Sequence, residues 1–174
     1  MAVYISLLRG INVSGQKKIK MVDLKQLYEA CSFTDVRTYI QSGNVVFNST
    51  LSDKNELATM ISKVIGQQYG FDVQVLVKSP KDIQRALDNN PFEHEKMYIT
   101  FLFDTPEDIP YDEINKVKLP SEQFEIIEDC IYFYCPDGYG RSKFSNNFLE
   151  RKLKVTMTSR NLRTTRKLLE MSSS

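Results

Sequence analysis

The sequence predicts an α+β protein built from two halves that share one order of helices and strands. Three observations support this fold class. A strand of apolar, β-prone residues opens the chain at 3–8, the turn Ser42-Gly43-Asn44 joins two β-rich runs, and apolar residues at helical spacing separate the strands. Hydrophobic side chains make up 41% of the 174 residues and aromatic ones 11%, which is enough for a folded core.

The first half has clear helix and turn signals between its strands. Asp53 and Glu56 form the pattern of a capping box at the start of the second helix, and Gly66 and Gly70 bracket its end. We expect strands at 3–8, 36–41, 45–48 and 73–77, and helices at 21–31 and from 53 to these glycines. This β-α-β-β-α-β order is that of the ferredoxin-like split βαβ unit.

The second half repeats this order, with a connecting helix before it and a helix after it. We expect the connecting helix at 79–87, strands at 97–103, 124–127, 131–135 and 155–158, and helices at 105–117, 145–153 and 160–171. Thr158 or Ser159 would cap the last helix. The sequence therefore predicts two ferredoxin-like α+β halves, at 1–78 and 92–174, joined by a connecting segment at 79–91.

The charge is unevenly distributed along the chain, although the formal net charge is only +1. Residues 1–78 sum to +3, residues 79–140 to −9 and residues 141–174 to +7. Basic ends around an acidic middle favour either packing between these parts or a local basic surface that attracts an anion.

Several classes of site are excluded by the residues present. His94 is the one histidine, so no metal site with several histidines can form, and we expect no metal. Phosphate-loop and nucleophile-elbow motifs are absent, and we expect no cofactor. Cys31, Cys130 and Cys135 are scattered, which favours free thiols and a cytoplasmic protein without a membrane segment.

The loop that follows the first strand is the strongest candidate for a binding site. In this topology the loop 9–20, the hairpin 42–44 and the turn 66–70 lie at the same end of the sheet. Glycines can turn backbone N–H groups outward, and an arginine fork suits a phosphate or carboxylate. The candidate ligand-binding residues are Arg9, Gly10, Asn12, Gly15, Lys18, Gln41, Ser42 and Asn44.

Two other interpretations of this loop remain open. The glycines could serve only the turns, with Arg9 paired to a carboxylate elsewhere in the chain. Alternatively, Arg9 and Asn44 could act as the arginine and water-positioning asparagine of acylphosphatases, which share this fold unit but carry a loop motif that is absent here. The sequence therefore leaves open whether the protein is an enzyme.

The C-terminal segment 141–167 carries the densest positive charge. Its candidate basic patch consists of Arg160, Asn161, Arg163 and Arg166. This segment could bind nucleic acid, but a solvated helix face, or a basic surface docked on the acidic middle of the chain, is favoured because the pI of about 7.6 is nearly neutral.

Four stretches of sequence resemble a known family. They are Leu7-Leu8-Arg9-Gly10-Ile11-Asn12-Val13, Ile19-Lys20-Met21, Thr38-Tyr39-Ile40-Gln41-Ser42-Gly43-Asn44-Val45-Val46-Phe47 and Thr158-Ser159-Arg160-Asn161. Together they resemble the bacterial domain-of-unknown-function family DUF1697 over nearly the whole chain. The resemblance implies a cytoplasmic α+β protein of ferredoxin-like halves, and it implies no activity.

Three functions therefore follow from the sequence. The first is binding of a small, phosphate-bearing anion at the Arg9–Lys20 loop. The second is binding of nucleic acid by the basic segment 141–167, and the third is a protein-interaction domain without catalysis.

Overall fold

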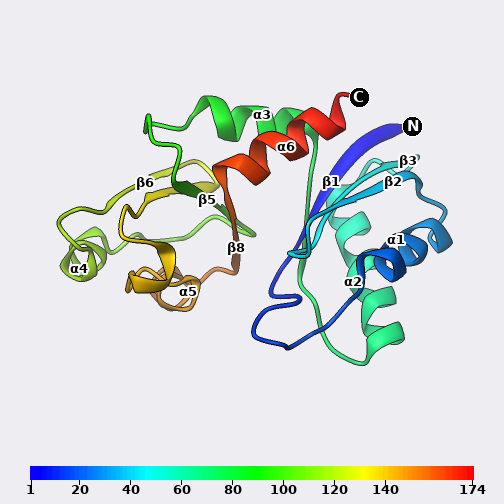
Figure 1. Cartoon of the computed structure of the whole chain (residues 1–174), viewed down its shortest axis with the longest axis horizontal. Helices are drawn as coiled ribbons and strands as arrows, with labels where there is room; N and C mark the ends of the chain where they lie inside the picture. Colours follow the sequence, from blue (N-terminus) through cyan, green and yellow to red (C-terminus); the bar gives the residue numbers. More distant parts are fainter. The chain divides into compact units, whose positions relative to one another are not determined.

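The computed structural model describes residues 1–174 and contains two four-stranded antiparallel sheets (Figure 1). The chain divides into two compact units, residues 1–85 with 167–174, and residues 86–166. The boundary falls inside α3 (Pro80–Asp88), within the segment that the sequence assigns to the connection. The last residues of α6 (Leu162–Ser172) group with the first unit.

The first unit confirms the predicted element order. Its elements are β1 (Ala2–Leu8), α1 (Met21–Ala30), β2 (Thr34–Tyr39), β3 (Asn44–Ser49), α2 (Lys54–Tyr69) and β4 (Val75–Lys78). The strand order β2-β3-β1-β4 places β1 between β3 and β4, as in the ferredoxin-like unit. Helices α1 and α2 bury Leu24, Tyr28, Leu57 and Ile61 against the strands in one apolar cluster.

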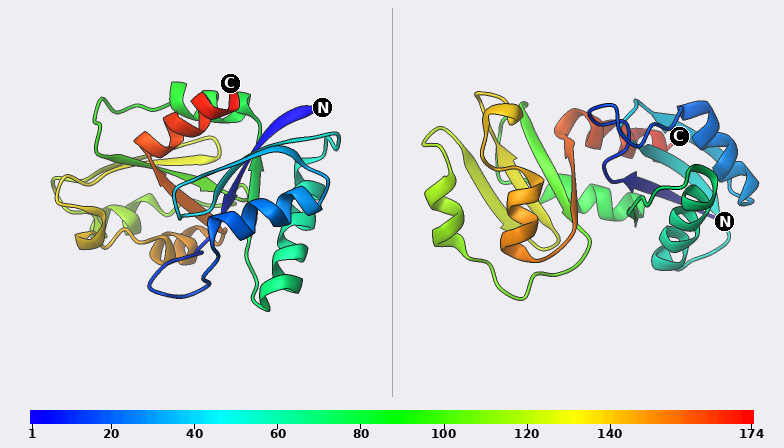
Figure 2. Two further views of the ribbon diagram at one scale, coloured as in Figure 1. Left: turned by 45° about the vertical axis from the view of Figure 1, so that its right-hand side comes forward. Right: turned by 90° about the horizontal axis from the view of Figure 1, so that it is seen from below.

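The second unit has the same strand order. Its elements are β5 (Met97–Leu102), α4 (Tyr111–Val117), β6 (Gln123–Ile127), β7 (Cys130–Tyr134), the short 3-10 helix η1 (Tyr139–Arg141), α5 (Asn146–Leu153) and β8 (Met157–Asn161). The order β6-β7-β5-β8 matches that of the first sheet. Helices α4 and α5 lie on one side of this sheet (Figures 1 and 2), where Ile114, Leu149 and Leu153 join its core.

Several predicted boundaries are wrong. The strand expected at 36–41 is β2, which ends at Tyr39, and the two largest shifts have identifiable causes. The helix expected at 105–117 begins only at Tyr111, because Pro106 and Pro110 interrupt the chain before it. The predicted end of helix α2 is confirmed, because the helix ends at Tyr69, between Gly66 and Gly70, and the φ of 74° at Gly70 forms the left-handed cap. The strand expected at 155–158 is β8, which continues to Asn161 because it pairs with β5.

No helix combines the length and the apolar character needed to cross a membrane.

Candidate functional site

Three connections of the first unit meet at one end of its sheet. Leu7 lies opposite Asn44 and Leu8 opposite Val75, so the end of β1 is next to the starts of β3 and β4. Backbone hydrogen bonds fasten this end, from Leu8 N to Gly43 O (2.8 Å) and from Arg9 N to Gln74 O (2.9 Å). The loop between β1 and α1 projects from this end (Figure 2). We call it the loop end and define it as residues 9–20, 40–44 and 70–74.

Asn12 holds two of these connections together. Its side-chain Nδ2 donates to the carbonyls of Ile19 (2.9 Å) and Gln41 (2.8 Å), and its Oδ1 accepts from the backbone N of Ile19 (2.9 Å). Asn12 also has a φ of 56°, a left-handed conformation that asparagine tolerates better than most residues. The Asn12 amide is therefore a structural brace, with both of its polar atoms in use.

Asn44 is also used within the hairpin. Its side chain is fully buried and donates to Tyr39 O (3.0 Å) and Ser42 Oγ (2.8 Å). The four-residue loop Ile40–Gly43 thus closes over an internal amide, with the exposed side chain of Gln41 at its outer edge. Asn44 cannot position a water for hydrolysis in this arrangement, which removes the geometric basis for the acylphosphatase comparison.

Two of the three predicted glycines have turn or packing roles. Gly15 follows Ser14 in a turn with positive φ at both central positions, closed by a hydrogen bond from Gln16 N to Val13 O (2.9 Å). Gly43 has a φ of 85°, and a Cβ added there would lie 2.6 Å from Leu8 Cβ. Gly10, with a φ of 72°, has open space around it.

The four basic residues of the loop differ in their surroundings. Lys17 Nζ donates to Asp72 O (2.6 Å), which ties the loop to the segment before β4. Arg9 is half-buried directly after β1, and its guanidinium remains a predicted ligand-binding group. Lys18 and Lys20 are exposed, and neither forms an ion pair or a side-chain hydrogen bond. These two ammonium groups are the ones available to a ligand.

The N-terminus of α1 lies directly after these lysines. Its N-cap residue is Lys20, in an extended conformation, and no side chain accepts a hydrogen bond from the first turn. In α2, α5 and α6, by contrast, the side chains of Asp53, Ser145 and Asn161 accept such bonds. The loop end thus combines free helix N–H groups with two unpaired cations. The absence of Ser, Thr, Asp or Asn before Met21 is the sequence signal that could have identified Lys20.

Comparison with known proteins agrees with the fold and with the motifs. Residues 1–132 match the family described as "Protein of unknown function (DUF1697)". The chain belongs to the DUF1697 family. The matched stretch includes all of the loop end, whereas the basic segment 141–167 lies outside it.

A solved bacterial structure has the same fold. The structure of a conserved bacterial protein from Streptococcus pneumoniae is similar to this DUF1697 chain, with a TM-score of 0.74 and 24% sequence identity. The match covers 98% of each chain and shows the shared fold. No curated protein matches the sequence.

The basic patch predicted at the C-terminal end of this DUF1697 chain is not a continuous surface. Arg160 belongs to β8 and is buried, with Nη1 donating to Thr158 Oγ1 and Ser159 O (both 2.8 Å). Burial lowers the pKa of Arg160 to about 10. Arg166 pairs with Glu95 at 2.8 Å, which leaves Arg163 as the exposed arginine without a partner.

Asn161 caps α6, so the prediction that Thr158 or Ser159 does so is wrong. Asn161 Oδ1 accepts from Thr164 N (2.8 Å), because β8 continues through Asn161 and the helix begins only at Leu162. We expect Asn161→Ala to lower the free energy of unfolding by about 1 kcal/mol. Asn161→Asp should lower it much less, because aspartate keeps the side-chain acceptor. Urea unfolding measures both changes. Equal losses in the two variants would show that the side-chain acceptor does not matter.

Proposed function

We propose that the protein binds a small anionic molecule of the phosphate-bearing class at its loop end. The observation that carries this proposal is the position of Lys18 and Lys20, which are exposed, unpaired and next to the uncapped first turn of α1. Backbone N–H groups and the positive end of a helix dipole attract anions, and phosphate oxygens accept several hydrogen bonds at once.

The charge balance of this end supports an anion. Asp23 is the acidic residue in the first turn of α1, and it follows three lysines of the loop in the sequence. Lys17 contributes its charge although its ammonium is hydrogen-bonded to a carbonyl. A ligand with one or two negative charges would compensate this local excess.

The braced loop reduces the cost of binding. Asn12, Lys17 and the turn at Ser14-Gly15 fix the loop through bonds within the chain. Lys18 and Lys20 thus project from a backbone that needs no further ordering when an anion arrives. Such preorganisation improves affinity by reducing the entropy lost on association.

A titration with inorganic pyrophosphate tests the proposal. We expect the double variant Lys18→Gln/Lys20→Gln to raise the dissociation constant, measured by calorimetry, about tenfold or more, since each charge-assisted contact contributes strongly. Lys63→Gln is the matched control, because Lys63 is an exposed, unpaired lysine on α2 of the same unit.

Each contrary result points to a named alternative. Equal binding by the wild type and the double variant would place the anion elsewhere. A short RNA that bound with a steep dependence on salt would favour the nucleic-acid function. Absence of binding by both probes would favour an interaction domain.

The same proposal includes a cytoplasmic location. None of the three cysteines Cys31, Cys130 and Cys135 forms a disulfide, and Cys130 and Cys135 are buried. Free thiols are typical of reducing compartments.

A further inference from the structure

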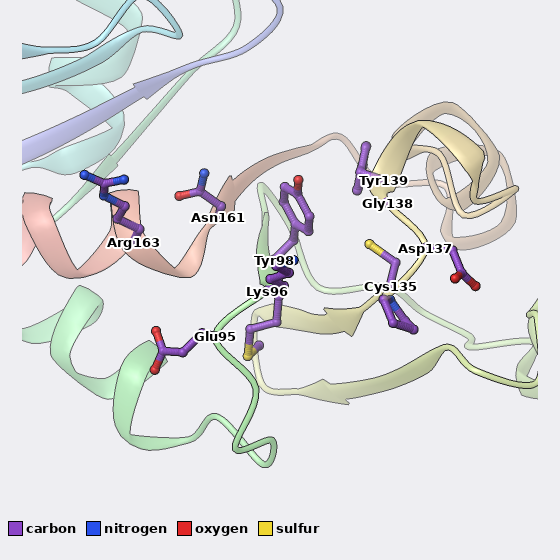
Figure 3. Close-up of a pocket in the computed structure, with 11 residues that line it drawn as sticks. Glu95, Lys96, Tyr98, Cys135, Asp137, Gly138, Tyr139, Asn161 and Arg163 are labelled. Atoms are coloured by element: carbon purple, nitrogen blue, oxygen red, sulfur yellow. The ribbon is translucent and has the colours of Figure 1, made fainter.

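The second unit contains a cavity that is separate from the loop end. It has a volume of about 420 Å³ and lies where β5 begins and β7 and β8 end. In Figure 3, Tyr98 stands in the middle of the lining, with Asn161 and Arg163 on one side and the segment Cys135–Tyr139 on the other. This volume is within the range of small-molecule sites.

Two tyrosines give the cavity an aromatic wall. The rings of Tyr98 and Tyr139 lie with centroids 4.6 Å apart at an angle of 44°. Burial raises the pKa of both phenols, so their hydroxyls remain protonated at neutral pH. The Tyr98 hydroxyl has no hydrogen-bond partner within the chain and can donate to a ligand.

Hydrogen bonds hold this wall in place. Tyr139 OH donates to Asn146 Oδ1 (2.8 Å), which also accepts from Ser159 Oγ (2.8 Å). Ser159 Oγ is in turn bonded to Thr100 Oγ1 at 2.7 Å. The chain of side chains connects η1, α5, β8 and β5, so the position of Tyr139 is fixed by three other elements of the unit.

Some charged side chains of the lining have a partner within the chain, and others do not. Glu95 is paired with Arg166, and Asp137 accepts from Ser121 Oγ (3.1 Å). Lys96 and Arg163 are exposed and make no ion pair or hydrogen bond. The two cations that remain without partners therefore favour a ligand with negative charge.

Cys135 contributes a thiol to the lining of the cavity. Burial, with a smaller contribution from the charge of Glu122, raises the pKa of its thiol to about 11. The sulfur therefore stays protonated at neutral pH and is not a nucleophile. Its place in the lining is that of an apolar contact.

We propose that this cavity binds a planar aromatic anion of the nucleoside monophosphate class, with the ring against Tyr98 and Tyr139 and the phosphate near Lys96 and Arg163. Aromatic side chains bind bases through stacking, and guanidinium groups match phosphate oxygens in pairs. The aromatic wall and the unpaired cations line the same cavity, so one ligand can use both.

Calorimetric titration of the full chain with adenosine 5′-monophosphate tests this proposal. Adenosine supplies the ring without the charge, and ribose 5-phosphate the charge without the ring. We expect the nucleotide to bind at least about tenfold more tightly than either fragment. Equal affinities for the nucleotide and ribose 5-phosphate would show that the ring is not recognised and would overturn the proposal.

Variants then locate the site. We expect Arg163→Gln and Tyr98→Leu each to weaken nucleotide binding about tenfold, and Tyr98→Phe to weaken it less because the ring is kept. Arg151→Gln is the control, since Arg151 is exposed on α5 of the same unit but outside the cavity. If Tyr98→Leu unfolds, Arg163→Gln still decides the result. Unchanged binding by Arg163→Gln, or no binding by the wild type, would contradict the proposal.

Discussion

Replacing Gly43 with alanine is expected to lower the free energy of unfolding by about 3–4 kcal/mol. The added Cβ would lie 2.6 Å from Leu8 Cβ and 3.0 Å from both Cγ1 and Cδ1 of Ile11, and β1 cannot move away without losing its pairing with β3 and β4. The positive φ of 85° adds strain for any residue with a side chain. Urea unfolding, followed by circular dichroism, measures the change.

Gly70→Ala is the matched control for this variant. Gly70 has a similar φ of 74°, but nothing lies within 4 Å of an added Cβ. We expect Gly70→Ala to lower the free energy of unfolding by about 1 kcal/mol, because only the backbone conformation is strained. The difference between the two variants measures the close approach of the hairpin to β1. Equal losses would mean that the hairpin can shift to make room.

Replacing Asn12 with alanine is expected to lower the free energy of unfolding by about 2–3 kcal/mol. The change removes three hydrogen bonds and leaves the carbonyls of Ile19 and Gln41 and the N–H of Ile19 without their partner. Because Asn12 bridges two connections, we also expect faster amide hydrogen exchange in both the loop 9–20 and the hairpin 40–44.

Two further variants separate the roles of the Asn12 side chain. Asn12→Asp keeps the acceptor for Ile19 N but loses both donated bonds, so we expect an intermediate loss of stability. Asn115→Ala, at an exposed position on α4, should be nearly neutral. A neutral Asn12→Ala would contradict the assignment of this amide as a brace and would return it to the candidate ligand groups.

The fold could be predicted from sequence because its signals are local. The capping pattern at Asp53 and the hairpin signal in Ser42-Gly43-Asn44 each depend on a few adjacent residues, and the order of elements then restricts the topology. The boundary of β8 could not be predicted in this way, because its pairing with the distant strand β5 extends it to Asn161.

For the candidate site, the sequence could predict the location but not the hydrogen-bond partner of each side chain. Topology alone brings the loop, the hairpin and the turn to one end, and the structure places them there. The use of each side chain depends on partners far along the chain, such as Gln41 for Asn12 and Asp72 for Lys17. Residue type could not show that these donors are already occupied, nor that Arg160 is buried.

The most direct test of the central proposal is a phosphate titration of the ¹⁵N-labelled protein followed by two-dimensional NMR. An anion bound at the loop end should shift the backbone amides of Lys18 and of Met21–Asp23, the uncapped first turn of α1, in one saturable process. Amides at the start of α2, where Asp53 already accepts two hydrogen bonds, should not move. Saturable shifts that left residues 18–23 unchanged, or no shifts at all, would contradict the proposed binding site.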